Sequence, residues 1–240
     1  MRISSATSTG KIRAVNEDSF FVSDARDASS NAVLAVVADG MGGHNAGEVA
    51  SAEAVNVFKN STFSADSDPK IVLLDAIECA NDVIYKMSQR SPKLHGMGTT
   101  VTACVISDNK VTAAQVGDSR LYLIKDGTLT QITSDHSLVE MLVARGSITK
   151  EDAKNHPQKN VITRAIGTES SVQADIYEFE IEHDDILLLC SDGLVNMVDD
   201  EKILSIITET EKFEELAGIL VNEAENEGGL DNITVILIKF

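Results

Sequence analysis

Two runs of apolar residues in this sequence end in an aspartate followed by a glycine, and this pattern constrains the fold most strongly. In the stretch VLAVVADGMGGHNAGE, residues 33–48, six apolar residues run directly into Asp39 and Gly40. In DILLLCSDGLVNMV a second such run ends at Asp192 and Gly193. Asp-Gly commonly forms a tight hairpin turn, but Gly40 is followed by a glycine-rich and then a helical segment. The pattern therefore indicates two core strands that end in carboxylates for a reason other than a turn.

A third Asp-Gly pair has the surroundings that a turn requires. In LYLIKDGTLTQIT, Asp126 and Gly127 separate two segments in which apolar and polar residues alternate. Alternating segments joined by two such residues predict a β-hairpin.

The length and composition are those of an ordinary globular protein. The 240 residues, 43% of them hydrophobic, are enough to form one large domain with a proper core. No linker or repeat marks a boundary, so we expect a single domain over 1–240. No stretch approaches the apolar length of a membrane span, and the N-terminal MRISSATSTGKIRAV lacks the apolar centre of a secretory signal. We therefore expect a cytoplasmic protein.

The spacing of the three cysteines does not favour disulfide bonds or a zinc site. Cys79, Cys104 and Cys190 lie far apart and form no CxxC pair. A disulfide framework and a cysteine zinc cluster are therefore not expected, and the histidines show no HExxH spacing that would serve zinc instead.

The net charge of −18 restricts the partners. A surface this acidic repels phosphate backbones and anionic lipid, so neither nucleic acid nor a membrane is expected as a partner. Part of the charge lies on two amphipathic helical patterns between 199 and 227, and there it is a solvated face. Other carboxylates lie beside apolar strands with no basic residue nearby, and a buried anion without a partner is too costly to persist. A bound cation would resolve that cost.

The order of elements predicts the α+β class, with layered antiparallel sheets covered by helices. Strand patterns come in hairpin-like runs separated by pairs of helical patterns, and because both chain ends are strand-like, we expect them to close the sheets centrally. The strands are expected near 2–9, 18–22, 32–38, 98–106, 110–117, 119–125, 128–133, 161–165, 173–181, 185–190 and 232–240. The helices are expected at 45–60, 70–90, 135–146, 199–209 and 212–226.

Five aspartates interrupt or end apolar strands, most of them beside a glycine: Asp18, Asp39, Asp118, Asp192 and Asp231. Several carboxylates with a backbone carbonyl make a site of hard oxygen ligands, which suits Mg²⁺ or Mn²⁺. Two such ions a few ångströms apart form the usual clamp for displacement at phosphorus. Each aspartate taken singly also fits a cap or a turn, and spacing alone does not bring the five together.

Eight segments, in order along the chain, resemble those of the metal-dependent protein serine/threonine phosphatases, the protein phosphatase 2C family in its compact bacterial form. They are GKIRAVNED, VADGMGGHNAGEVAS, GMGTT, VGDSRLYL, TSDHSLV, HPQKNVITRAIG, CSDGL and GGLDNIT. The resemblance implies a four-layer α-β-β-α sandwich, with two antiparallel sheets face to face and helices on both outer faces. It also implies hydrolysis of phosphoserine and phosphothreonine in proteins at a pair of Mn²⁺ or Mg²⁺ ions.

The same resemblance implies the metal ligands. Asp39 would bridge the two ions, the Gly40 carbonyl would bind one of them, and Asp192 and Asp231 would complete the set. Asp118, together with Asp192, matches the place of a weaker third ion in bacterial members.

Four further residues follow from the resemblance. Glu17 and Asp18 match the acidic pair that holds metal-bound waters, and Arg13 matches the arginine that grips the substrate phosphate. Animal members place a candidate general acid directly after the metal-binding glycine, where this chain has Met41. Here His44, three residues further on, takes that part or only lines the loop.

The resemblance further implies direct attack on phosphorus by a water that the metals activate, with no phosphoenzyme. No cysteine has the arginine six residues later that a cysteine phosphatase needs. Phosphorylated proteins and a cognate serine/threonine kinase are the expected partners of a monomer, with a flap at about 147–160 beside the channel. A catalytically silent binding domain and a two-metal nuclease are the alternatives; intact ligand positions oppose the first, and the acidic charge opposes the second.

Overall fold

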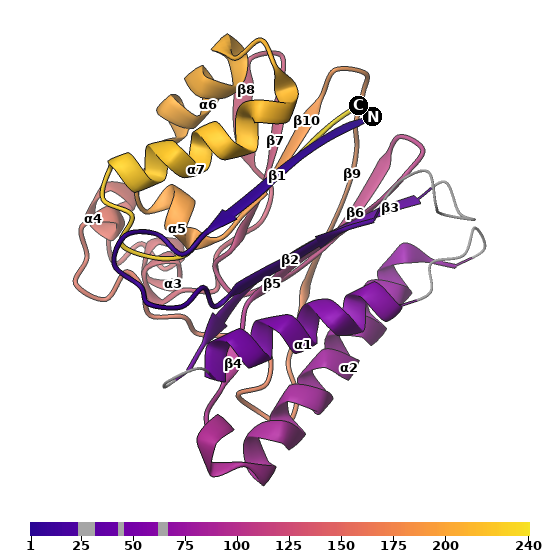
Figure 1. The fold of residues 1–240 in the computed structure, drawn as a ribbon, viewed down its shortest axis with the longest axis vertical. Helices are drawn as coiled ribbons and strands as arrows, with labels where there is room; N and C mark the ends of the chain where they lie inside the picture. The colour runs from indigo at the N-terminus through magenta and orange to yellow at the C-terminus, as the bar shows by residue number, and fades with distance from the viewer. Residues whose placement is uncertain (24–31, 43–45, 62–66) are drawn as a thin grey trace.

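The computed structural model describes residues 1–23, 32–42, 46–61 and 67–240. His44 lies outside the described residues. Two antiparallel sheets pack face to face in the middle of the molecule, and helices cover both outer faces (Figure 1). This is the four-layer α+β sandwich that the sequence predicts.

The first sheet brings the chain ends together. Its strands stand in the order β1-β11-β10-β7-β8, and each pairs antiparallel with its neighbours. The strands are β1 (Arg2–Ser8), β11 (Ile233–Lys239), β10 (Ile186–Cys190), β7 (Arg120–Lys125) and β8 (Thr128–Gln131). The predicted hairpin joins β7 to β8 with a positive φ at both Asp126 and Gly127, 50° and 71°, as a primed two-residue turn requires.

The second sheet has the order β2-β3-β5-β6-β9, also antiparallel throughout. Its strands are β2 (Asp18–Val22), β3 (Ala32–Met41), β5 (Val101–Ser107), β6 (Lys110–Val116) and β9 (Asp175–Glu180), and the two-residue β4 (Gly98–Thr99) pairs with the end of β3.

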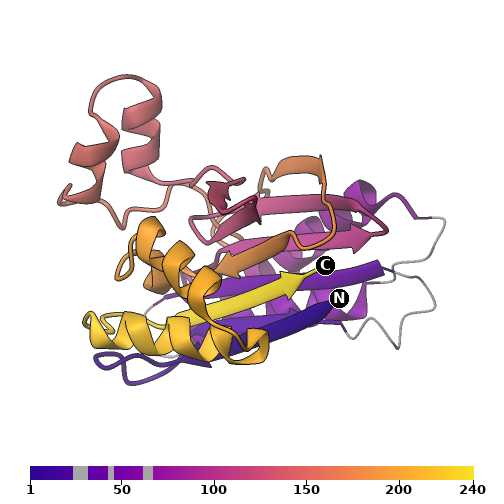
Figure 2. The ribbon, with the colours of Figure 1, turned by 90° about the horizontal axis from the view of Figure 1, so that it is seen from above.

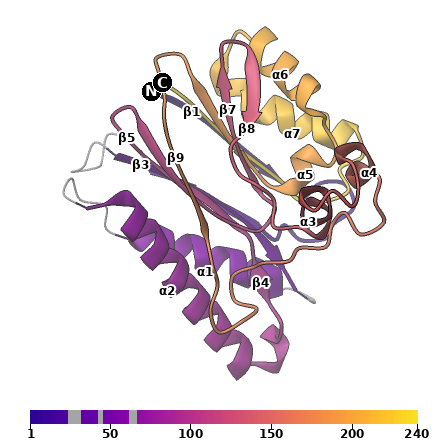
Figure 3. The same cartoon turned by 180° about the vertical axis from the view of Figure 1, so that it is seen from behind.

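Each sheet has its own helices. On one outer face lie the two long helices, and on the other lie two shorter ones with α5 near the sheet edge (Figures 1 and 3). The helices are α1 (Ala46–Asn60), α2 (Pro69–Arg90), α5 (Asp192–Val195), α6 (Asp200–Glu209) and α7 (Leu216–Asn226), with 3₁₀ turns η1 (Pro92–Leu94) and η2 (Phe213–Glu215). The remaining pair, α3 (Leu138–Ala144) and α4 (Lys150–Lys154), projects away from the sandwich (Figure 2). No helix in the described ranges is both long and apolar enough to cross a membrane.

The layer between the sheets is apolar at one end and polar at the other. Alternate residues of each strand face this layer, and Val33, Ala35 and Val37 of β3 belong to its buried apolar cluster. The same alternation continues along each strand into hydroxyl, amide and carboxyl side chains. This polar end of the inter-sheet layer contains Asp18, Asp39, Thr102, Gln115, Ser119, Ser191 and Thr234.

Three expectations about the elements are wrong. The predicted strand at 161–165 is absent, because this stretch makes only one isolated bridge, Ser137 with Ile162, and the next bridge, Thr99 with Ile166, lies just beyond it. β1 lies at a sheet edge rather than in the centre, and β11 lies inside the sheet as the second of its five strands. The helix expected over 135–146 is shorter, and the short α4 within the following polar stretch was not anticipated.

Candidate metal centre

The five aspartates singled out in the sequence meet at the polar end of the inter-sheet layer. Asp18 and Asp39 are directly opposite each other on β2 and β3. Asp192 follows β10 and Asp231 precedes β11, which are neighbouring antiparallel strands. Asp118 lies where the chain crosses from β6 of one sheet to β7 of the other. The fold therefore brings together acids that are far apart in the sequence.

The Asp18 carboxylate is held by two hydroxyl groups. It is buried, and its Oδ2 accepts hydrogen bonds of 2.7 Å from Ser191 Oγ and from Thr234 Oγ1. Burial raises the pKa of Asp18 to about 7, the two hydroxyl donors oppose that rise, and the charges of Asp192 and Asp231 add to it. Ser191 and Thr234 were not selected in the sequence, although both stand in segments that carry the resemblance.

Asp39 and Asp192 keep part of their surface open to solvent. Burial of the rest, together with the negative charges around it, raises the pKa of Asp39 well above its usual value. Burial also raises the pKa of Asp192 to about 6, while a hydrogen bond between the two carboxyl groups opposes the rise. Two carboxyl groups that share a hydrogen bond cannot both be charged without a cation nearby.

Asp118 is buried, and its pKa is raised to about 8, first by burial and then by the charges of Asp192 and Asp135. The nearby Arg120 opposes this rise. Arg120 itself grips Asp135 with two guanidinium nitrogens, at 2.7 to 3.0 Å. Its charge is therefore committed to a protein partner.

Gly40 has no room for a side chain. A Cβ there would collide with the Gly47 carbonyl and would stand 2.6 Å from the Glu17 carbonyl. A Cβ on Gly47, in turn, would lie 2.6 Å from Glu17 Oε1. The end of β3, the start of α1 and the Glu17 carboxyl group thus pack without intervening side chains.

Among the described residues, the buried side-chain nitrogen and oxygen atoms without a hydrogen-bond partner are Glu17 Oε1, Asp18 Oδ1 and Asp118 Oδ1. All three are carboxyl oxygens of this one site. Buried polar atoms are almost always hydrogen-bonded, so each exception requires an explanation. Hard cations such as Mg²⁺ and Mn²⁺ take oxygen ligands, and the residues present therefore fit such ions.

The carboxyl groups lie near one another but do not form a complete set of ligands around one point. Within the described part of the chain, no three acidic, histidine or cysteine side chains are already grouped as ligands around one point. This agrees with the coordination habit of Mg²⁺, which keeps several waters and is bound through one or two carboxylates. The unpartnered oxygens are the stronger sign of a cation site, since a site that includes water and a backbone carbonyl need not contain three side-chain ligands.

Arg13 reaches the site from the loop before β2. Its Nη2 donates a 2.7 Å hydrogen bond to Asp231 Oδ2, and this bond raises the pKa of the guanidinium. The loop is anchored by Asn232, whose Nδ2 donates to the carbonyls of Thr9 and Val15 at 3.0 Å. Asn232 Oδ1 accepts from the Glu17 amide at 2.8 Å. Asn232 was not selected in the sequence, yet it ties Arg13 and Glu17 to the segment that carries Asp231.

The two threonines of GMGTT have a structural part in the site. Thr100 Oγ1 accepts from the Asp39 amide at 3.0 Å, and Thr99 Oγ1 donates to the Asp39 carbonyl at 2.9 Å. The backbone of Asp39 is therefore fixed on both sides.

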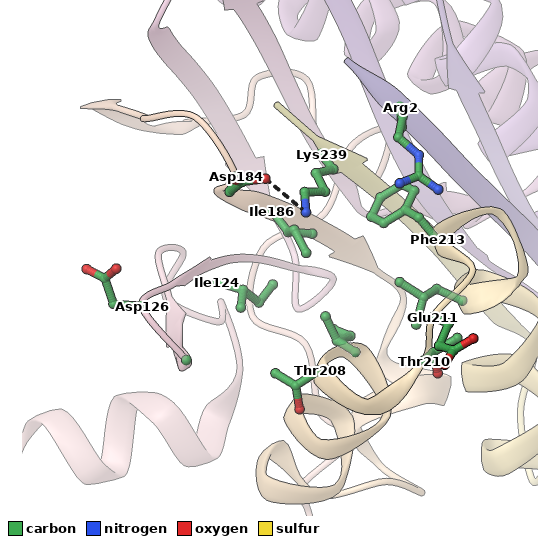
Figure 4. A pocket seen from close by; sticks show the side chains of 13 residues that line it. Arg2, Ile124, Asp126, Asp184, Ile186, Thr208, Thr210, Glu211, Phe213 and Lys239 are labelled. Atoms are coloured by element: carbon green, nitrogen blue, oxygen red, sulfur yellow. Dashed lines mark ion pairs between the residues drawn. The ribbon is translucent and has the colours of Figure 1, made fainter.

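A separate cavity of about 320 Å³ lies at the other end of β1 and β11, where Arg2 and Lys239 are paired. Figure 4 shows Lys239 against Asp184, with Arg2 and Phe213 beside them. This cavity contains none of the five aspartates, so we place the candidate site at the polar end of the inter-sheet layer.

Comparison with known proteins agrees with this geometry. Residues 7–227 match the model of the family described as protein phosphatase 2C. The serine/threonine phosphatase stp of Listeria welshimeri is 41% identical over 238 residues, which cover 97% of this chain and 93% of the relative. Protein phosphatase PhpP of Streptococcus pneumoniae is 38% identical over 243 residues, covering 100% of this chain and 97% of the relative.

Solved structures have the same fold. The serine/threonine phosphatase of S. agalactiae superposes with a TM-score of 0.92 at 37% identity and covers 98% of both chains. The catalytic domain of the phosphatase PstP, solved in complex with two manganese ions, gives a TM-score of 0.87 at 37% identity and covers 98% of this chain and 96% of that one. The chain belongs to the protein phosphatase 2C family and is a metal-dependent serine/threonine protein phosphatase.

Proposed function

We propose that this enzyme, a single catalytic domain over 1–240, hydrolyses phosphoserine and phosphothreonine in proteins by direct attack of water on phosphorus at a two-metal centre. Asp39, the Gly40 carbonyl, Asp192 and Asp231 would hold the two ions. The observation that carries the proposal is the set of three buried, unpartnered carboxyl oxygens at one end of the sandwich. The PstP relative with two manganese ions supports the number of ions.

Two divalent cations, Mn²⁺ or Mg²⁺, would lower the pKa of water, so that hydroxide is available near neutral pH. Asp18 and Glu17 would accept hydrogen bonds from water near the ions, through oxygens that have no partner in the described part of the protein. Asp118 and Asp192 offer oxygens for a weaker third ion. The raised pKa values of Asp18 and Asp118 mean that these groups release protons when a cation binds.

Arg13 binds the substrate phosphate. A guanidinium has five N–H donors in a planar fork that matches two phosphate oxygens, and the bond to Asp231 directs this fork toward the metal centre. Attack forms a new phosphorus–oxygen bond to water and breaks the bond to the serine oxygen, which takes up a proton. We propose that His44 donates this proton to the serine oxygen. The His44→Ala variant tests this role.

A cysteine nucleophile is disfavoured by the thiols themselves. Cys104 and Cys190 are fully buried, and burial raises the pKa of each thiol to about 12. The thiolate is the nucleophilic form, so neither group supplies one at neutral pH. Cys79 is exposed on α2, outside the acidic cluster. Direct hydrolysis is therefore the better proposal.

In the cell, we propose that the enzyme acts as a monomer and reverses the work of a serine/threonine protein kinase. The net charge of −18 supports a preference for phosphorylated segments with basic flanks over acidic ones. The flap at about 147–160 would shape the approach of such segments.

The proposal is tested with p-nitrophenyl phosphate and with a phosphothreonine peptide. Activity should require Mn²⁺ or Mg²⁺, vanish in EDTA and return when the ion is restored. Asp192→Ala should lower kcat by at least about 100-fold, which is the upper end of the loss for outer contacts of a metal site, while the exposed Asp82→Ala on α2 leaves it unchanged. Full turnover by the chelated enzyme would exclude the two-metal centre, and binding of phosphopeptide without turnover would favour the silent binding domain.

A further inference from the structure

The chain crosses from one sheet to the other through Gly117, Asp118 and Ser119, at the polar end of the inter-sheet layer. We propose that Gln115, a residue with no assigned role, is a positioning residue that holds this crossover and thereby sets the place of the Asp118 carboxylate relative to Asp39. This inference rests on the proposed metal centre.

Gln115 holds the peptide carbonyls on both sides of Asp118. Its side chain is fully buried between the sheets. Nε2 donates to the Gly117 carbonyl at 2.9 Å and to the Ser119 carbonyl at 2.6 Å. Oε1 lies 2.6 Å from Thr102 Oγ1 on the neighbouring strand, and that hydroxyl also stands 2.9 Å from the Ser119 carbonyl. One planar amide therefore fixes the backbone before and after Asp118.

The Asp118 side chain depends on this backbone for its direction. Its Oδ1 has no hydrogen-bond partner among the described residues. Gly117 has a φ of 108°, and a Cβ there would lie 2.5 Å from Thr100 Cβ, so the crossover passes tightly over Thr100. Where no direct contact orients a carboxyl oxygen, the peptide groups that carry it decide where it points.

The same scaffold also holds Asp39. Ser119 Oγ and Thr100 Oγ1 are 2.8 Å apart, and Thr100 Oγ1 accepts from the Asp39 amide at 3.0 Å. A continuous buried chain of hydrogen bonds thus runs from Gln115 through Ser119 and Thr100 to Asp39. Because every polar atom of Gln115 is satisfied, such a network rigidifies its surroundings instead of weakening them.

On the far side, His136 joins the crossover to the base of the flap. The Gly117 amide donates to His136 Nδ1 at 3.1 Å, and the His136 amide donates to the Gly117 carbonyl at 2.9 Å. The Thr163 amide in turn donates to the His136 carbonyl at 2.8 Å. The crossover is therefore fixed from three directions, and Gln115 is the member that comes from within the core.

The test is the direct binding of Mn²⁺, measured by calorimetry on the full chain. Gln115→Met keeps the length of the side chain but removes the amide, and we expect about a 10-fold weaker affinity at the site that depends on Asp118, the lower end of the loss for outer contacts of a metal site. In the Asp118→Ala background the same substitution should change nothing further. If Gln115→Met is poorly folded, Gln115→Asn replaces it in the test. Its shorter side chain keeps an amide that cannot reach the Gly117 and Ser119 carbonyls, so we expect the same loss of Mn²⁺ affinity.

Val111→Ala is the matched control. Val111 lies on the same strand and the same face as Gln115, and it is fully buried. It should lower the melting temperature without changing the Mn²⁺ isotherm. An unchanged isotherm for folded Gln115→Met, or an equal loss with and without Asp118, would overturn the inference. If Asp39→Asn and Asp192→Ala also leave the isotherm unchanged, the proposed metal centre itself is wrong.

Discussion

The two carboxyl oxygens of Asp18 have different surroundings. One carboxyl oxygen accepts two hydroxyl hydrogen bonds, and the other has no partner among the described residues. The paired oxygen fixes the side chain, because two short charge-assisted hydrogen bonds leave it little freedom. The unpartnered oxygen is then the one left to face the candidate metal centre.

Ser191→Ala removes one of these two bonds and should weaken Mn²⁺ binding at pH 7 by about 10-fold, the lower end of the loss for outer contacts of a metal site. The Ser191 bond lowers the pKa of Asp18, so its loss favours the protonated group that binds no cation. Calorimetric titration with Mn²⁺ measures the effect. Ser4→Ala is the control, since Ser4 is also buried and hydrogen-bonded, to the Glu214 carbonyl, but lies at the other end of β1. Equal affinities for both variants would contradict the role of Ser191.

For single residues, the sequence allows the aspartates to be predicted as candidate site residues, but not the side chains that hold them in place. Each aspartate stands beside a recognisable strand end or glycine, which is a local signal. The contacts of Ser191 and Thr234 with Asp18 depend on how one sheet is placed over the other, and Gln115 is one polar residue among apolar neighbours. Nothing local distinguishes such residues from ordinary strand positions. Arg120 and Arg164 form ion pairs with Asp135 and Asp175.

Among the elements, α3 and α4 differ from the other described helices because none of their residues is buried. α4 is nevertheless well formed at its start, where Thr149 and Asp152 make a capping box. The base of the segment is fixed by the Leu138 amide, which donates to the Val161 carbonyl at 2.8 Å. The segment that contains α4 can therefore be replaced without removing any buried residue from the core.

Replacing 147–159 by a short Gly/Ser linker should change kcat/KM for a phosphoprotein by about 10-fold or more, while kcat/KM for p-nitrophenyl phosphate stays within about 2-fold. The physical reason is that binding contacts remote from the reacting bond matter only for a substrate large enough to reach them. Both rates are measured on the same preparation. Equal changes for the two substrates would show that the segment is a plain surface loop.

The elements were predictable where periodicity extended over many residues. The long α1 and α2 and the β7–β8 hairpin were expected within a residue or two. The failure at 161–165 has a clear reason: the β-branched residues there favour a strand, but among them only Ile162 forms a bridge, with Ser137. The sequence does not reveal strand order either, and the expected central place of β1 is therefore wrong.

For the molecule as a whole, the acid cluster makes stability depend on pH in an unusual direction. Burial raises the pKa values of Asp192, Asp18 and Asp118 to about 6, 7 and 8. A carboxyl group whose pKa is higher in the folded state stabilises the fold below its unfolded pKa, and this contribution is lost as the pH rises through the folded value.

The chelated protein should therefore melt at a lower temperature at pH 8.5 than at pH 5.5, because the pH rises through about 6 to about 8 in this window. Saturating Mn²⁺ should abolish the difference, since a cation binds the deprotonated groups. Thermal melts with and without EDTA measure this, and Asp118→Asn should reduce the slope in EDTA. A melting temperature of the chelated protein that rises with pH would contradict the assignment.

The order of strands has a consequence for how this enzyme is made. β11 follows all other described strands in the sequence, yet it lies between β1 and β10 and supplies Thr234 to Asp18. Asp231 comes just before it. A chain still being synthesised on the ribosome thus exposes the edge of β1 and lacks part of the acid cluster until Asp231 and β11 emerge. Phosphatase activity consequently requires that β11 has emerged and inserted between β1 and β10.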